Sequence, residues 1–176
     1  EKLKNQAKEI SMPLDTPDIM PTLLGLAGVS IPEDVEGLNR ASVILGTKKP
    51  DTDHAALITC PAPFGQWSRD KGGREYRGVR TTRYTYCRDL NGPWLLYDNE
   101  SDPFQLVNLV NNPEHPQLQK RLDDRLNSLL KQTRDEFLSG LELVARSGYV
   151  VNPDNETVDY NIPFNPANIT KSPIAG

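Results

Sequence analysis

Leucines recur at helical spacing in the second half of the chain. They stand at positions 118, 122, 126, 129 and 130, and Phe137 and Leu138 continue the same face. A period near 3.6 residues over several turns is typical of an amphipathic helix, with leucines toward a core and charged residues toward solvent. The pattern predicts one long helix over residues 116–139, which Gly140 ends or kinks.

Four shorter segments have the character of β-strands. One is an apolar run, and the other three are rich in β-branched and aromatic side chains. The connections between them are short, so successive segments predict an antiparallel meander of about four strands. A turn is expected at residues 91–93, where Asn, Gly and Pro follow one another. The expected strands are residues 55–59, 75–80, 84–88 and 94–97.

A short helix is expected near the N-terminus, within residues 15–28. Asp18 is placed to cap it, and Pro21 falls in the first turn, where a missing N–H group breaks no intrahelical bond. Gly28 suits the left-handed position that ends many helices. The residues that follow, 29–53, have the composition of a loop.

These elements predict an α+β fold, in which the long helix packs on one face of a small antiparallel sheet. Residues 94–97 are apolar at consecutive positions, so both faces of that strand need cover, and the second cover has to come from elsewhere. The expected organisation is a leader or linker (1–12), a helix with its connecting loop (13–53), the α+β subdomain (54–146) and an irregular tail rich in Pro and Asn (147–176).

Composition narrows the possible functions. The 176 residues carry a net charge of −4, which argues against a nucleic-acid binder, because neutralising phosphates needs a basic surface. No apolar run approaches the length that spans a bilayer, so no membrane partner is expected. Cys60 and Cys87 are the two cysteines, too few for a disulfide scaffold or a four-thiolate zinc site.

Three places in the sequence hold residue types that catalyse reactions or bind metals. Cys60 could be a nucleophile, but neither histidine sits in a recognisable catalytic context, and a buried cysteine at a strand end is the simpler interpretation. The run from Asp51 to His54 contains metal-ligand types but also suits a polar turn before a strand. Asp123 and Asp124 lie on the polar side of the long helix and diverge by about 100°. We therefore predict no catalytic residue and no metal site in this chain.

Residues 66–89 are basic within an acidic chain, with seven basic side chains against three acidic ones and aromatic residues between them. Guanidinium groups bind sulfate, phosphate and carboxylate through paired hydrogen bonds. Ordinary cross-strand ion pairing explains the same composition, and the sequence leaves both interpretations open. The candidate binding residues are Trp67, Arg69, Lys71 and Arg74.

The order of these motifs resembles the C-terminal part of a type I sulfatase of the alkaline phosphatase superfamily. The resemblance covers residues 13–137, and several motifs occur in one order at compatible spacing. The most specific motif is DTPDIMPTLLGLAG, which begins at Asp15 and ends at Gly28. The further motifs are Ile31-Pro32, Val35-Glu36-Gly37, YRGVRT (76–81), RYTY (83–86), LYDNESDP (96–103) and residues 106–109.

In that family a formylglycine made from Cys or Ser cleaves a sulfate ester with the help of a calcium ion. The formylglycine and the residues that hold the calcium ion belong to a large N-terminal catalytic domain. The resemblance therefore implies that this chain holds no cofactor of its own. Residues 60–64, CPAPF, come close to the family's nucleophile motif, but Phe64 replaces the required arginine. The implied partner is the catalytic domain of the same protein, and the implied location is periplasmic or secreted.

Three hypotheses follow for the function. In the first, the chain is the C-terminal domain of a sulfatase-like hydrolase, inactive alone, with the loop of Trp67, Arg69, Lys71 and Arg74 framing the cleft for a sulfated substrate. In the second, it is a self-standing binding module that uses loop 66–74. In the third, it is a cysteine hydrolase centred on Cys60. The first predicts an exposed apolar surface where the catalytic domain docks.

Overall fold

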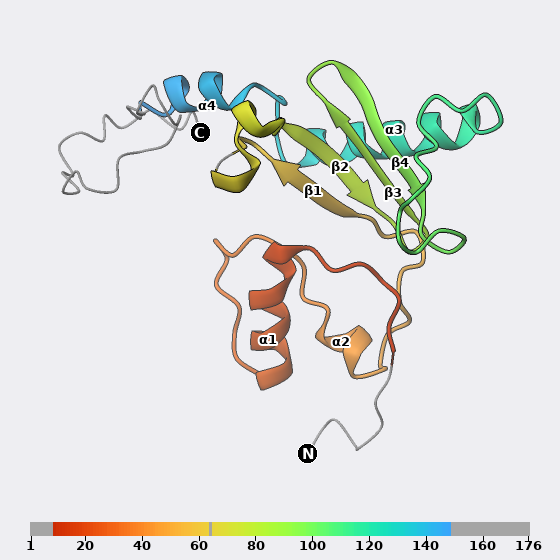
Figure 1. The fold of residues 1–176 in the computed structure, drawn as a ribbon. Helices are drawn as coiled ribbons and strands as arrows, with labels where there is room; N and C mark the ends of the chain where they lie inside the picture. Colours follow the sequence, from red (N-terminus) through yellow and green to blue (C-terminus); the bar gives the residue numbers. More distant parts are fainter. Residues whose placement is uncertain (1–8, 64, 149–176) are drawn as a thin grey trace.

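The structure is a computed structural model that describes residues 9–63 and 65–148. It has the expected α+β architecture, a four-stranded antiparallel sheet with helices (Figure 1). Most of the expected leader (1–12) and tail (147–176) lie outside the described residues. The elements in chain order are η1 (Thr16–Asp18), α1 (Ile19–Ala27), α2 (Ala41–Ile44), β1 (Ala56–Cys60), η2 (Gly65–Trp67), η3 (Arg69–Lys71), β2 (Tyr76–Arg80), β3 (Tyr84–Asp89), β4 (Gly92–Asp98), α3 (Pro116–Gln132) and α4 (Gly140–Arg146).

The strands follow one another in the order β1-β2-β3-β4, which confirms the predicted meander. Leu57 pairs with Val79, Val79 with Tyr86, and Tyr86 with Leu96, so one face of the sheet carries a row of large apolar side chains. The turn expected at residues 91–93 was placed too late, because β4 already begins at Gly92. Pro93 is tolerated there because β4 is an edge strand, where a missing N–H group leaves no partner unpaired.

Helix α3 packs on β2 and β3 and forms the core with them, as the leucine pattern predicts (Figure 1). Leu126, Tyr86 and Leu96 are fully buried. Burying side chains of this size contributes roughly 1.5–3 kcal/mol each. The fully or nearly fully buried core residues are Ala55, Val79, Tyr86, Leu96, Leu122, Leu126 and Leu130.

The long helix ends earlier than its pattern predicts, at Gln132 instead of residue 139. Arg134 and Phe137 then take left-handed backbone angles, with φ of 56° and 52°, which no helix accommodates. Phe137 still packs against the core, which is why it continued the apolar face in the sequence. Gly140, expected to end the helix, instead begins α4, whose capping box is formed by Ser139 and Glu142.

The first helix lies where the sequence predicts it and ends at Gly28, whose φ of 72° is left-handed. Asp18 does not cap it, since its side chain makes no hydrogen bond to the helix N-terminus. Asp18 instead accepts a bond from the backbone N–H of Leu38, 2.6 Å away, and so fixes the loop that returns to the helix. That loop, predicted irregular over 29–53, also contains the one-turn helix α2.

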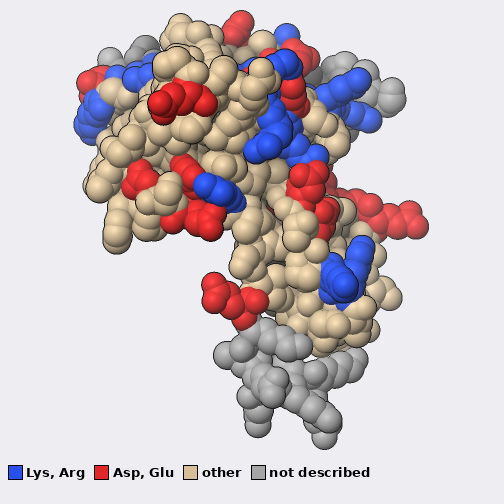
Figure 2. All heavy atoms as spheres, turned by 90° about the vertical axis from the view of Figure 1, so that its right-hand side faces the viewer, with Lys and Arg blue, Asp and Glu red and all other residues tan. Residues whose placement is uncertain are grey.

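Helices α1 and α2 form a separate layer beyond the edge strand β1, on the far side from α3 and α4 (Figure 1). In α1 only Pro21 and Thr22 are buried, while Ile19, Met20 and Leu23 are 47–60% exposed. Figure 2 shows this layer as a narrower lobe below the lobe of the sheet, with acidic and basic side chains mixed on the visible face. None of the helices in the described part has the length and apolar character needed to cross a membrane.

Candidate functional site

The loop between β1 and β2 holds all four of the predicted binding residues. It contains the two short helices η2 and η3, and Gly72, with φ of 87°, ends the second of them. A Cβ atom on Gly73 would lie 1.8 Å from the backbone oxygen of Trp67, so the loop needs a glycine there to fold back on itself. Trp67, Arg69, Lys71 and Arg74 are therefore held by a compact loop beside the sheet.

Arg69 is tied to the scaffold. Its guanidinium group donates to both oxygens of Glu75 at 2.6–2.8 Å. Glu75 is 3% exposed and also accepts a bond of 2.8 Å from the backbone N–H of Gly140, the first residue of α4. One buried carboxylate therefore fastens both the loop and helix α4 to the start of β2.

Arg74 is also paired. It donates to Asp89 at 2.9 Å and lies over the ring of Trp94, 4.7 Å from the ring centre. Trp94 in turn contacts Tyr76, with ring centres 5.5 Å apart. This stack covers one end of the sheet face that α3 does not cover. It therefore provides cover for Trp94, one of the four consecutive apolar residues of β4.

Trp67 and Lys71 point toward solvent. The Trp67 side chain is 43% exposed, and Lys71 is exposed with its Nζ atom 3.2 Å from the backbone oxygen of Gly65. Arg74 is exposed to a similar extent, with 44% of its side chain accessible, whereas the Arg69 side chain is 31% exposed. Carboxylates neutralise most of the other basic residues in the range 66–89. Arg83, for example, pairs with Asp98, and Arg88 pairs with Asp123.

Cys60 lies at the end of β1 and is half-buried. Burial and the negative charge of Glu75 raise the pKa of its thiol. A cysteine nucleophile requires the opposite, since the thiolate is the reactive form. This environment gives Cys60 no activation and argues against the cysteine hydrolase.

The structure also brings together a cluster that the sequence did not predict, formed by Asp15, Asp18, Arg40 and His54. Ligand atoms of the two carboxylates and the imidazole lie within 4.8 Å of one another. Arg40 donates from Nε to Asp18 at 3.0 Å, and its Nη2 lies 3.2 and 3.0 Å from the two ring nitrogens of His54. Asp15, Asp18 and His54 border a groove of about 1290 Å³ that follows β1.

This cluster does not suit calcium, the metal that the sulfatase resemblance implies. Calcium takes six to eight oxygen ligands, whereas His54 offers nitrogen. Arg40 already places a positive charge against Asp18 and His54, and Asp15 Oδ1 accepts the Leu57 N–H at 2.7 Å. The sequence pointed to Asp51 and Asp53 as neighbours of His54 because they are adjacent in the chain. Asp51 instead shapes the turn before β1 by accepting the N–H of Asp53 at 3.0 Å.

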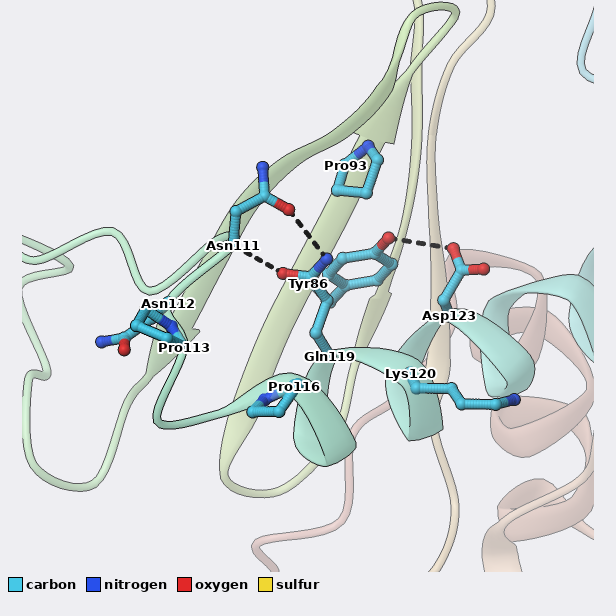
Figure 3. Close-up of a pocket in the computed structure, with 9 residues that line it drawn as sticks. All are labelled: Tyr86, Pro93, Asn111, Asn112, Pro113, Pro116, Gln119, Lys120 and Asp123. Atoms are coloured by element: carbon cyan, nitrogen blue, oxygen red, sulfur yellow. Dashed lines mark hydrogen bonds between the residues drawn. The ribbon is translucent and has the colours of Figure 1, made fainter.

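A second pocket, of about 360 Å³, lies between the start of α3 and the β3–β4 strands (Figure 3). Its polar groups bind one another: the Tyr86 hydroxyl donates to Asp123 at 2.9 Å, and Gln119 bonds twice with Asn111. Asp123, expected to be an ordinary surface residue, is thus an acceptor for the buried tyrosine. Because these groups are already paired, the pocket stabilises the helix against the sheet and presents no catalytic pair.

Comparison with known proteins identifies relatives over most of the chain. The profile of the protein family described as N-sulphoglucosamine sulphohydrolase, C-terminal, matches residues 1–132. An ulvan-active sulfatase of Formosa agariphila is 36% identical over 160 residues, which are 89% of this chain and 30% of that protein. An endo-4-O-sulfatase of Bacteroides thetaiotaomicron is 30% identical over 158 residues, 83% of this chain and 31% of that protein. The chain thus spans about 30% of the length of these relatives.

Solved structures show the same fold. A protein in complex with its substrate D-glucosamine-2-N,6-O-disulfate matches with a TM-score of 0.57 and 28% identity, over 68% of this chain and 24% of that one. A 2-O GAG sulfatase matches with a TM-score of 0.60 over 78% of this chain and 29% of its own, and at 24% identity this likeness concerns the fold alone.

Proposed function

Because the chain belongs to the C-terminal family of the sulfatases, within the alkaline phosphatase superfamily, we propose that it completes the fold and frames the substrate cleft of an enzyme that cleaves sulfate esters. The catalytic domain of the whole protein would supply the formylglycine and the calcium ion. The similarity to the ulvan-active sulfatase and to the endo-4-O-sulfatase supports a sulfated saccharide as the substrate. We place the whole protein in the periplasm or outside the cell.

The observation that carries this proposal is the exposed apolar surface of α1. A helix that is apolar on nearly all sides is normally buried, yet most of α1 is open to solvent. Leu14 and Leu38 extend the surface, with 48% and 57% of their areas exposed. The catalytic domain of the same protein is the occupant we propose. A self-standing binding module would need polar residues at these positions.

We expect Leu23→Glu to abolish most of the sulfatase activity of the whole protein, because a buried unpaired carboxylate would oppose docking of the catalytic domain. The 176-residue chain alone should keep its melting temperature, since Leu23 is 60% exposed there. Aryl sulfate hydrolysis and soluble yield of the whole protein are the measurements.

Leu90→Glu is the matched control for this experiment. Leu90 is 47% exposed and lies in the β3–β4 turn, at the end of the molecule away from α1 (Figure 1). Equal activity in the Leu23→Glu and wild-type whole proteins would refute the docking surface. Absence of sulfatase activity in the wild-type whole protein would refute the proposed function.

In the whole protein, we further propose that loop 66–74 contacts the saccharide beyond the scissile sulfate, through Trp67 and Lys71, with Arg69 and Arg74 holding its shape. Trp67→Ala and Lys71→Ala should each raise KM for a sulfated oligosaccharide by about three- to tenfold, equivalent to roughly 0.7–1.4 kcal/mol. A small aryl sulfate, which does not reach the rim, should show unchanged kcat and KM. Lys131→Ala, at an exposed position on α3, is the control, and equal effects on both substrates would refute the rim.

A further inference from the structure

Two parts of the molecule are joined by a continuous line of polar contacts centred on His54. On one side, Asp18 accepts from the Leu38 backbone and from Arg40, which holds the α1–α2 layer together. Arg40 then reaches the ring of His54, which directly precedes the sheet. The layer thus reaches the sheet lobe through the contact between Arg40 and His54.

A second contact runs beside the first. Asp15 accepts from the backbone N–H of Leu57 in β1 and lies 3.8 Å from His54 Nε2. Asp15 therefore occupies a position on the free edge of β1 where the carbonyl of a neighbouring strand would otherwise bind. These two contacts pass through the His54 imidazole or lie beside it.

The contact with Arg40 requires a neutral histidine. A guanidinium group has only donors, and a neutral imidazole keeps one ring nitrogen without a proton and no charge, whereas a protonated imidazole has only donors and carries a positive charge. The side chains of His54 and Arg40 are each only 12% exposed, and Asp18 is 3% exposed, so solvent screens the cluster weakly. Protonation of His54 removes the acceptor and places two positive charges about 3 Å apart.

Charged groups from every neighbouring element face this imidazole. Arg40 comes from the segment before α2, Asp15 and Asp18 from the segment at η1, and Asp51 from the turn before β1. Arg125 of α3 donates to the backbone oxygen of Asp53, next to His54. Burial and Arg40 lower the pKa of His54, and this outweighs the three carboxylates, which act in the opposite direction.

We propose that His54 is an acid-sensitive latch that fastens the α1–α2 layer to the sheet while its imidazole is neutral and releases it on protonation. This inference goes beyond the proposed function, because it concerns the stability of the junction and holds for the chain alone. Release would alter the position of the layer that carries the exposed α1 surface, and so the docking of a catalytic domain.

The direction of the pH effect follows from the folded and unfolded states. The unfolded chain takes up a proton on His54 near the ordinary pKa of 6.5, whereas the folded chain does so only at lower pH. The stability from this contact is therefore present above pH 6.5 and is lost as the pH falls toward the folded-state pKa of His54. Asp15 acts oppositely and at lower pH, because burial raises the pKa of its carboxyl from 3.8.

The test compares the wild-type 176-residue chain with His54→Asn, whose amide oxygen can accept from Arg40 but does not titrate. Between pH 7.5 and 5.5 the wild-type melting temperature should fall by roughly 2–4 °C more than that of the variant. Hydrogen exchange at the Leu38 and Leu57 amides, corrected for the intrinsic pH dependence, should lose protection over the same range only in wild type. His115→Asn removes the other histidine and should behave like wild type.

Nuclear magnetic resonance gives a second measurement if His54→Asn does not fold. The chain has two histidines, so the His115→Asn variant leaves a single imidazole signal to titrate. A midpoint for His54 below 6.5, with loss of Leu57 protection at that midpoint, supports the latch. A midpoint at or above 6.5, or Leu57 protection that stays constant through it, would overturn the proposal.

Discussion

Asp135→Ala is expected to destabilise the chain by about 3–5 kcal/mol, because it leaves a buried guanidinium group without its counterion. Arg77 is 2% exposed, and both its Nε and Nη2 atoms donate to the carboxylate of Asp135. Its third nitrogen donates to the backbone oxygens of Cys60 and Tyr76 at 3.2 and 3.1 Å. These two carbonyls hold the guanidinium in place, so it cannot turn out to solvent when Asp135 is removed.

Urea unfolding of the chain at neutral pH measures this effect. The matched control is Asp124→Ala, since Asp124 forms an exposed pair with Lys120 on the same helix that should be worth only a few tenths of a kcal/mol. The double variant Arg77→Met/Asp135→Leu should recover much of the loss, because it removes the charge as well as its partner. A loss below about 1 kcal/mol in Asp135→Ala would contradict the role we assign to the pair.

Acid should weaken the same pair. Burial alone would raise the pKa of Asp135, but the hydrogen bonds from Arg77 and from the Phe137 backbone outweigh it and hold that pKa below its ordinary value of 3.8. A carboxyl group with a lowered folded-state pKa contributes stability above the unfolded value, and that contribution disappears as the pH falls through the folded value. The difference in unfolding free energy between wild type and Asp135→Ala should therefore shrink below about pH 4.

This pair also explains why the end of α3 could not be read from the sequence. Residues 133–139 contain neither glycine nor proline, and Phe137 and Leu138 continue the apolar face of the helix, so local patterns favour continuation. In the structure Asp135 turns back to Arg77. Phe137 packs against the same guanidinium group, and the Arg77 Cζ atom lies 4.9 Å from the centre of the Phe137 ring. A contact between residues far apart in the chain thus overrides the local helical preference.

The strands and the core face of α3 were predictable because period and residue type are local properties. The register of β2 on β3 follows from the short turn between them, and the buried leucines follow from the 3.6-residue repeat. The charged contacts were not predictable in this way. The sequence shows an excess of arginine in residues 66–89, but it does not show that Glu75 and Asp89 neutralise two members of the predicted binding loop.

The His54 cluster illustrates the same limit. Asp51 and Asp53 lie close to His54 in the chain, so the sequence indicates them as its partners. Its partners in space are Arg40 and Asp15, which reach it only because the α1–α2 layer folds back onto the edge of β1. No spacing rule predicts this, whereas the sulfatase resemblance did place Asp15 and Asp18 in its most specific motif.

Glu75→Ala should destabilise the chain by about 2–4 kcal/mol, because it removes the buried carboxylate that Arg69 and the Gly140 amide share as an acceptor. The expected loss is smaller than that for Asp135, since Arg69 retains 31% exposure and can turn toward water. Glu75→Gln should lose less, because the amide oxygen still accepts one of the bonds. Chemical denaturation measures the stability, and hydrogen exchange at Gly140 shows whether α4 has detached.

The control is Glu136→Ala, which removes an exposed pair with Arg146 whose side chains are about 60% exposed. That variant should change the unfolding free energy by less than about 1 kcal/mol. In the whole protein, Glu75→Ala should also raise KM for the sulfated oligosaccharide and leave a small aryl sulfate unaffected, because Glu75 positions the loop of Trp67 and Lys71 and touches no substrate. If KM stays unchanged while the Gly140 amide loses protection, the Glu75 carboxylate holds only α4. In that case the loop keeps its shape through Gly73 and its own backbone hydrogen bonds.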